Sequence, residues 1–350
     1  MDWILYGAAG TTGRLITEVA VRRGHRPILA GRSAGPLRSL AERHGLAWQA
    51  VDLEDARRLQ QLVGTAPLTL LAAGPFHTAS LRVAQACLAS GAHYLDLANE
   101  VPVLEAIYGL DDVARARGVT LLPAVGFGAV AADGLARHVA DLLPTANSLD
   151  LTIDLYTAGT SPAARANALR VLADGGQLRR DGLLTRVRLG SSTSGAIVPA
   201  GARAVITVPS GELSAVSRTT GIANISVSRP VALPPLLARV LLPALPLIAG
   251  SQAVQRYIAR RRPTELPPAD PERRSRIWAR ANDADGQMAT VLLETTEGYA
   301  FSAQSAVAAV EAVLAGPVPG AHSPGALLGP DFALRIPGTR RIDMRVGAEV

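Results

Sequence analysis

The sequence contains no lysine, and all 35 of its basic residues are arginine. A chain without lysine cannot form a Schiff base on an amine side chain, and it cannot build a phosphate-binding loop of the Walker type. The tyrosine–lysine pair that short-chain dehydrogenases use is excluded for the same reason. Mechanisms that depend on an amine side chain are therefore absent.

Cysteine and aromatic residues are also scarce. The single cysteine, Cys87, cannot form an internal disulfide, and its alanine-rich surroundings predict a small buried side chain. Aromatic residues make up 4% of the chain and hydrophobic residues 48%, so alanine, valine and leucine must supply most of a large core. No signal-peptide pattern surrounds the strand-like residues 3–6, and we expect a cytoplasmic location.

The formal net charge of +6 raises the question of nucleic-acid binding. The arginines are scattered, however, with one tight cluster at residues 260–262, and few aromatic side chains are present to stack on bases. We therefore expect no nucleic-acid partner, and an anionic ligand would account for part of the excess charge. The histidines show no repeated ligand spacing, so no metal site is predicted.

The order of strand and helix signals predicts the fold. A length of 350 residues suits two domains. In the first part, strand and helix patterns alternate, which predicts a parallel sheet with helices on its faces. From about residue 149, strand patterns are separated by loops, which is typical of a mixed sheet. Strands are predicted at 3–6, 26–30, 47–51, 68–72, 93–97 and 119–124, and helices at 12–23, 37–45, 56–63, 80–90 and 103–117.

We therefore predict an α/β protein with three parts. Residues 1–125 form a Rossmann domain, and residues 126–315 form a second α+β domain built on a mixed sheet. Residues 316–350 form a tail, rich in glycine and proline, that packs back on the first domain.

Residues 231–249 form a nearly continuous apolar run close to the length of a membrane span. The run holds Arg239 and four prolines, which would interrupt a spanning helix several times. Three interpretations stay open: an element of the core or of a dimer interface, a lipophilic substrate gate or membrane-surface contact, and a true span.

A glycine-rich turn at residues 7–13 follows the first strand and opens the first helix. Glycines there permit a tight turn, close approach of the backbone to a pyrophosphate, and close packing of the helix on the strand. The start of the helix supplies free N–H groups for phosphate oxygens. The predicted contacts are Gly7, Gly10, Thr11, Thr12 and Gly13.

The end of the second strand distinguishes NADP from NAD. An NAD-binding domain usually carries an acid at this place, whereas this chain has Arg32 and Ser33. A guanidinium and a hydroxyl bind a 2′-phosphate, so the predicted cofactor is NADP, and Arg38 is near enough to assist. The alternative is that Arg32 is a solvated surface charge.

Two further strand ends extend the predicted cofactor site. Asp52 follows the third strand and could touch the adenine edge, cap the helix that begins near Ala56, or lie on the surface. The fourth strand ends in Ala73, Gly74, Pro75 and Phe76, which should lie near the ribose and nicotinamide. Phe76 could instead be a core anchor.

With these motifs, the chain resembles the saccharopine dehydrogenase-like oxidoreductases, in particular the subgroup that includes trans-acting enoyl reductases. The resemblance rests on segments 7–13, 73–76, 94–97 with Glu100, 123–127, 220–225 and 329–332. The chain departs from the family pattern at Asn99, at Gly128 and at residues 209–212, all around the expected substrate cleft. The resemblance implies hydride transfer from NADPH to a polarised double bond, C=C of an enoyl group, C=N or C=O. The apolar run 231–249 would suit a lipophilic or carrier-bound substrate. It also implies a homodimer.

Candidates for acid–base chemistry lie at the expected carboxyl ends of strands four to six or on the facing domain. His77 could protonate substrate, or it could be a surface or capping residue. Asp96 and Glu100 could form a coupled acid pair, or they could fix loops through backbone N–H groups. Arg165 could bind an acidic substrate group, and Asp133 is predicted to cap a helix over 134–142. An alternative function is a catalytically inert NADP-binding sensor.

Overall fold

The computed structural model describes residues 2–161, 164, 165, 167, 168, 173, 175–189, 196, 197, 199, 200, 204–231, 251 and 267–348. The chain divides into two compact units. The first unit comprises Met1–Val130 and Tyr299–Leu328, and the second comprises Ala131–Gly298 and Gly329–Val350. The apolar run 231–249 lies outside the described residues, apart from Val231.

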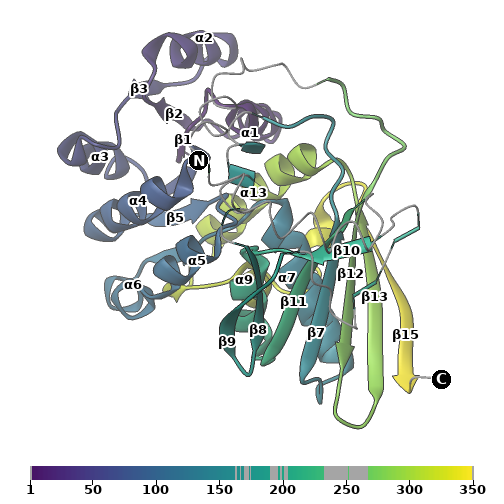
Figure 1. Cartoon of the computed structure of the whole chain (residues 1–350). Helices are drawn as coiled ribbons and strands as arrows, with labels where there is room; N and C mark the ends of the chain where they lie inside the picture. The colour runs from purple at the N-terminus through teal and green to yellow at the C-terminus, as the bar shows by residue number, and fades with distance from the viewer. Residues whose placement is uncertain are drawn as a thin grey trace. The chain divides into compact units, whose positions relative to one another are not determined.

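The first unit is built on a parallel sheet, as predicted (Figure 1). Its strands are β1 (Ile4–Tyr6), β2 (Ile28–Gly31), β3 (Trp48–Ala50), β4 (Leu68–Leu71), β5 (His93–Asp96), β6 (Thr120–Leu122) and β14 (Gly320–Ala321). Their order is β14-β6-β5-β4-β1-β2-β3. This is the strand order of the dinucleotide-binding fold with one short strand added beside β6, and it places a change of direction between β1 and β4.

Helices alternate with these strands along the chain. They are α1 (Thr11–Arg22), α2 (Ala34–His44), α3 (Ala56–Val63), α4 (Phe76–Ser90), α5 (Val101–Tyr108), α6 (Asp111–Arg117), α13 (Gly298–Ala315) and α14 (Pro324–Leu328). Helix α3 begins where the Asp55 carboxylate accepts a hydrogen bond from the Arg58 N–H at 3.0 Å. The single helix predicted over 103–117 is two helices, because the chain turns at Gly109 and Leu110.

The core of the first unit is aliphatic, as the composition predicts. Strands β1, β4 and β6 are buried along their whole length, which is typical of central parallel strands covered on both faces. Helix α13 packs here through Phe301, whose ring meets that of Phe127 edge-on with the centroids 5.6 Å apart. The Ser305 hydroxyl donates to the Val125 carbonyl oxygen at 2.8 Å. Cys87 is fully buried.

The second unit contains a mixed sheet, again as predicted (Figure 1). Its strands are β7 (Ser148–Asp154), β8 (Gly176–Arg180), β9 (Leu183–Val187), β10 (Ala204–Thr207), β11 (Asn224–Val231), β12 (Ser275–Asn282), β13 (Gln287–Thr295) and β15 (Arg340–Ala348). The order is β15-β13-β12-β7-β11-β8-β9, and β10 pairs with β11. Strands β7 and β11 are parallel, and the other pairs are antiparallel. Its helices with given bounds among the described residues are α7 (Phe127–Leu142), which begins in the first unit, α9 (Glu212–Thr220) and the short 3-10 helix η2 (Phe332–Arg335).

The observed division differs from the expected boundaries at 125 and 315. The first unit continues to Val130 and includes Tyr299–Leu328, because α13 shares the core of the parallel sheet. The tail expected to pack on the first domain divides into two. Strand β14 joins the parallel sheet, whereas the nine-residue strand β15 pairs with β13 of the second sheet.

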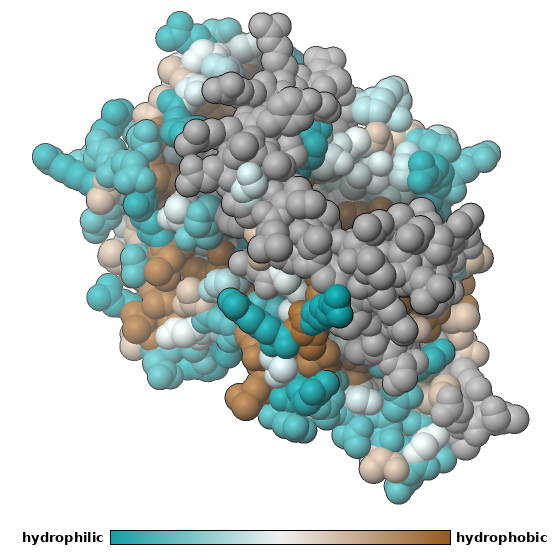
Figure 2. All heavy atoms as spheres, in the orientation of Figure 1, coloured by the Kyte–Doolittle hydropathy of each residue, from teal (hydrophilic) through white to brown (hydrophobic). Residues whose placement is uncertain are grey.

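Among the described residues, no helix combines the length and apolarity needed to cross a bilayer. On the face shown in Figure 2, polar side chains are interspersed with apolar ones in the coloured part of the surface. The most exposed large apolar side chains that are described are Leu183 on β9 and Met344 on β15.

Candidate functional site

The glycine turn joins β1 to α1 in the first unit. Gly7 has a φ of 95° and its N–H donates to the Ala30 carbonyl oxygen at 2.7 Å. A Cβ atom on Gly13 would lie 2.2 Å from the Gly7 carbonyl oxygen, so only glycine fits where the helix meets the strand. Helix α1 begins at Thr11 without a side-chain cap, which leaves its first N–H groups available to phosphate oxygens.

Arg32 and Ser33 lie directly beyond β2, at the start of α2. Both residues are exposed, and Ser33 occupies the N-cap position of α2 without forming a side-chain cap bond. A hydroxyl, a guanidinium and a helix N-terminus thus adjoin one another, which is the donor set that a 2′-phosphate requires. The guanidinium of Arg38, predicted to assist, lies 5.5 Å from the ring centroid of Trp48 on β3.

Tyr6, at the end of β1, connects the second and third strand ends. Its hydroxyl donates to the Val51 carbonyl oxygen at 2.7 Å. Burial raises the pKa of Tyr6 to about 12, the Asp52 carboxylate contributes to the rise, and the Arg32 guanidinium opposes it. Arg32 and Asp52 therefore lie within electrostatic reach of the same phenol.

Asp52 is exposed and its carboxylate accepts from the Glu54 N–H at 3.0 Å. The interpretation of Asp52 as a helix cap is wrong, because Asp55 caps α3. A place at the adenine edge or on the open surface is compatible with this geometry.

The segment after β4 lies against the glycine turn. A Cβ atom on Gly7 would be 2.7 Å from the Cβ atom of Ala73, so the two loops are in contact. The peptide bond between Gly74 and Pro75 is cis, and α4 begins at Phe76. Phe76 is half-buried, which is less than a core anchor requires, and Gly74 and Pro75 are exposed.

Asp96 is a fully buried carboxylate at the end of β5. It accepts four hydrogen bonds, from the hydroxyls of Ser80 (2.9 Å) and Tyr94 (2.6 Å) and from the N–H groups of Ala98 (3.0 Å) and Ala124 (2.8 Å). Burial raises the pKa of Asp96, and these bonds oppose the rise, that from Tyr94 most strongly. Asp96 therefore joins β5, α4 and the turn after β6, where Ala124 is held at a φ of 63°.

Glu100 is 6% exposed and precedes α5, and its carboxylate accepts from the Asn99 N–H at 2.9 Å. The partners of Asp96 are the four donors given above, so the coupled acid pair expected for Asp96 and Glu100 does not form in the described contacts. His77 lies in the first turn of α4 and is exposed.

Two predicted residues belong to the second unit. The Arg165 guanidinium donates to the Thr160 carbonyl oxygen at 2.6 Å, and the Ser161 hydroxyl accepts from the Ala164 N–H at 3.1 Å. The prediction that Asp133 caps a helix at Gly134 is wrong. Helix α7 already begins at Phe127, and Asp133 is buried within it.

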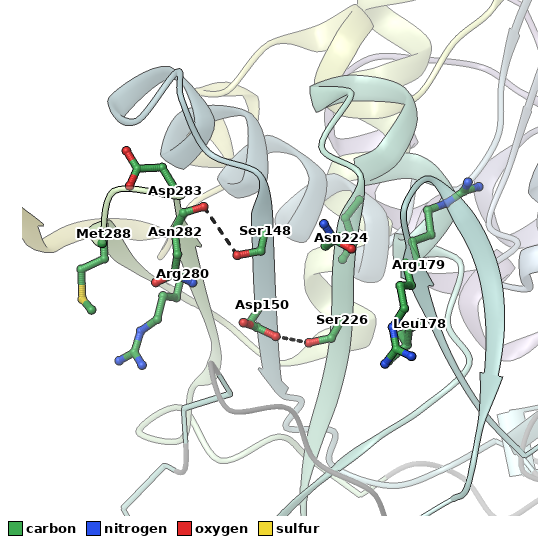
Figure 3. A pocket seen from close by; sticks show the side chains of 13 residues that line it. Ser148, Asp150, Leu178, Arg179, Asn224, Ser226, Arg280, Asn282, Asp283 and Met288 are labelled. Atoms are coloured by element: carbon green, nitrogen blue, oxygen red, sulfur yellow. Dashed lines mark hydrogen bonds between the residues drawn. The ribbon is translucent and has the colours of Figure 1, made fainter. Parts of the chain in front are cut away.

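Sequence reasoning missed a polar cavity of about 500 Å³ on the second sheet (Figure 3). Alternate residues of β7 and β12 face it, and Leu149 and Ala281 between them are buried in the core, whereas β11 contributes three consecutive residues. Its lining comprises Ser148, Asp150, Leu178, Arg179, Arg180, Asn224, Ile225, Ser226, Arg280, Asn282, Asp283, Gly286 and Met288. The alternation was visible in sequence, but the pairing of these strands was not.

Comparison with known proteins concerns mainly the first unit. Residues 3–122 match the family described as the saccharopine dehydrogenase NADP binding domain. A trans-acting enoyl reductase of Mycobacterium leprae is 31% identical over 140 residues, which are 38% of this chain and 34% of that protein. A trans-acting enoyl reductase of Mycobacterium tuberculosis is 27% identical over 196 residues, 51% of this chain and 47% of that protein. The matches span about a third to a half of the length of these relatives.

One solved structure resembles nearly the whole chain. It is apo saccharopine dehydrogenase (L-Glu forming) from Saccharomyces cerevisiae, with a TM-score of 0.63, 13% identity, and coverage of 98% of this chain and 100% of that one. At this identity the likeness concerns the fold, and it extends through both units.

Proposed function

We propose that this protein is an NADPH-dependent reductase, because residues 3–122 match the saccharopine dehydrogenase NADP binding domain family. The observation that carries the proposal is the glycine turn at the start of α1 together with Arg32 and Ser33 at the start of α2. The former suits a pyrophosphate and the latter a 2′-phosphate.

Each part of the predicted cofactor site has a distinct task in this proposal. The N–H groups around Gly10, Thr11, Thr12 and Gly13 bind the pyrophosphate, and Arg32 and Ser33 bind the 2′-phosphate. Asp52 contacts the adenosine, and residues 73–76 support the ribose and nicotinamide. The bound cofactor supplies the hydride, and the protein orients it.

The proposed acceptor is a polarised double bond. The relatives' name, trans-acting enoyl reductase, favours the C=C bond of an enoyl group. We propose that the substrate is a lipophilic acyl chain, either free or carried on a partner. Substrates with a polarised C=N or C=O bond are the alternatives. Homodimer formation and peripheral lipid contact through residues 231–249 belong to the same proposal.

A reductase also needs a proton donor. We assign this role to His77, which is exposed beside the segment after β4, with Glu100 as the second candidate. Asp96 is proposed to position the loops that hold the cofactor, because its four hydrogen bonds join them. Arg165 is proposed to bind an acidic group of the substrate.

The first experiment is a fluorescence titration of the purified protein with NADPH and NADH. We expect tight binding of NADPH and weak binding of NADH. A screen of enoyl thioesters, imines and ketones then follows NADPH oxidation, with His77→Gln as the comparison protein. Binding of neither cofactor would overturn the proposal.

A second candidate function is an NADP-binding sensor without turnover. The observation that favours it is that Asp96 has all its hydrogen-bonding capacity engaged, which leaves fewer acids for proton transfer. Tight NADPH binding with no oxidation across the full screen would support the sensor.

A further inference from the structure

The polar cavity of the second sheet is independent of the glycine turn and of the residues proposed for catalysis. It opens on the sheet face that carries Ser148 and Asp150 of β7, Ser226 of β11, and Arg280 and Asn282 of β12 (Figure 3). By register, Asp150 pairs with Arg280 on one side and with Ser226 on the other, so the three form a row across three strands. A volume of about 500 Å³ is within the range of small-molecule sites.

The acids of the cavity are already engaged within the protein. Asp283 accepts from the Thr145 hydroxyl at 2.8 Å and from the N–H groups of Asp285 (3.0 Å) and Gln287 (2.8 Å), and the Thr145 bond above all lowers its pKa. Asp150 accepts from the Ser226 hydroxyl, as Figure 3 shows.

Three donor groups are not engaged in the same way. In the described part of the chain, the guanidinium of Arg180 has no hydrogen bond or ion pair, and the same holds for the carboxamide of Asn282. Among the described residues, the side chain of Arg280 is contacted only at Nε, which donates to the Thr290 hydroxyl at 3.4 Å. Within that part of the chain, both terminal nitrogens of its guanidinium have no partner, and together they can bind two oxygens at once.

We infer that this cavity binds an oxyanion, a carboxylate or phosphate, carried by a small polar molecule. Arg280 and Asn282 are two residues apart on one strand and therefore face the same side, where they form the oxyanion subsite. Arg180 lies on β8, three strands away from β12. At a spacing of about 4.8 Å per strand, this separation is about 14 Å, so Arg180 meets the far end of an extended ligand. Leu178 and Met288 also line the cavity, where they would contact the carbon skeleton of the ligand.

The test is isothermal titration of the full-length protein, without NADPH, with citrate and with inorganic phosphate at constant ionic strength. We expect saturable one-to-one binding of at least one of them. Arg280→Gln should weaken this binding at least tenfold. Arg186→Gln is the matched control: it removes one exposed positive charge from β9 of the same sheet, outside the cavity, and should change affinity less than twofold.

Two further measurements separate a loss of ligand binding from a loss of folding and test the geometry of the guanidinium. Thermal unfolding and NADPH titration of Arg280→Gln show whether the variant is folded, and Arg280→Lys, which keeps the charge but loses the two-pronged geometry, should bind with intermediate affinity. Equal affinity in Arg280→Gln and the unsubstituted protein would overturn the inference. So would binding only to vesicles that contain phosphatidic acid, because the ligand would then be a lipid headgroup.

Discussion

A Cβ atom on Gly13 would lie 2.2 Å from the carbonyl oxygen of Gly7. Real Cβ atoms do not approach backbone this closely, so Gly13→Ala must move α1 away from β1 and disturb the turn. We expect a loss of about 1–3 kcal/mol in the free energy of unfolding and a large loss of NADPH affinity. Urea unfolding and fluorescence titration measure the two effects.

Gly35→Ala is the control for this substitution. Gly35 lies in α2, and no neighbouring atom is within 4 Å of the position that an alanine methyl group would take. Alanine there should be neutral or stabilising by up to about 1 kcal/mol. If Gly13→Ala behaves like Gly35→Ala, the close packing at the turn is not needed for binding.

Arg32 should discriminate between the two nicotinamide cofactors. Arg32→Ala is expected to weaken NADPH binding by about 1.5–3 kcal/mol, because a hydrogen-bonded charge pair with the 2′-phosphate is lost. NADH binding should change little. Arg38→Ala is the comparison, since Arg38 lies over Trp48 and should affect both cofactors equally. If Arg32→Ala lost the same amount of affinity for NADH as for NADPH, Arg32 would instead support the fold.

Asp96 should behave as a structural residue rather than as an acid in turnover. Asp96→Asn replaces a carboxylate that accepts four hydrogen bonds, and we expect a loss of about 3 kcal/mol or more in the free energy of unfolding. Glu42→Gln, on the exposed side of α2, is the control and should change the free energy of unfolding by less than about 0.5 kcal/mol. Unchanged stability with lost turnover would instead assign Asp96 to catalysis.

Glu294 should make the second unit sensitive to acid. Its carboxylate accepts from Arg276 at 2.8 Å and from Arg340, which lowers its pKa below 4.5 in the folded state, with Arg276 as the main cause. The stabilisation is therefore fully present above pH 4.5 and is lost as the pH falls through the lowered pKa.

The matched experiment compares Glu294→Gln with the unsubstituted protein from pH 7 to pH 3. At pH 7 the variant should be less stable by about 1.5–3 kcal/mol, and the difference should shrink in acid. Glu272→Gln, an exposed residue of the same unit, should show no such pH dependence. A difference that stays constant with pH would show that the two ion pairs add no charge-dependent stability.

Cys87 should be unreactive while the protein is folded. Burial raises the pKa of its thiol to about 12, so almost no thiolate is present at pH 8. A chromogenic thiol reagent should give no signal in buffer and one equivalent after urea is added. Rapid reaction in buffer would mean that α4 opens readily.

The first unit was the more predictable part of the fold, because its signals are local. The helix predicted over 56–63 has those bounds, and a capping aspartate fixes its start. The parallel sheet was predicted from the alternation of strand and helix patterns along the chain. Helix α7 was predicted too short, since Asp133 was taken as its cap, whereas Asp133 is buried within a helix that begins at Phe127.

The second unit was harder to predict because its contacts are distant in sequence. Strand β15 was missed in a tail rich in glycine and proline, although β13 supplies a full partner for it. Helix α9 was missed because its serines and threonines favour turns in isolation. The cavity residues come from segments up to 140 positions apart, and only the strand pairing brings them together.

The chain leaves the first unit at Val130 and returns to it at Tyr299. During synthesis, the nucleotide-binding half must therefore wait for most of the remaining polypeptide before Phe301 and Ser305 can reach Phe127 and Val125. An expression fragment that stops near residue 130 would expose the apolar surface that α13 covers and should aggregate. Engineering this cofactor domain as a separate module thus requires grafting residues 299–328 onto it, through a new linker, rather than simple truncation.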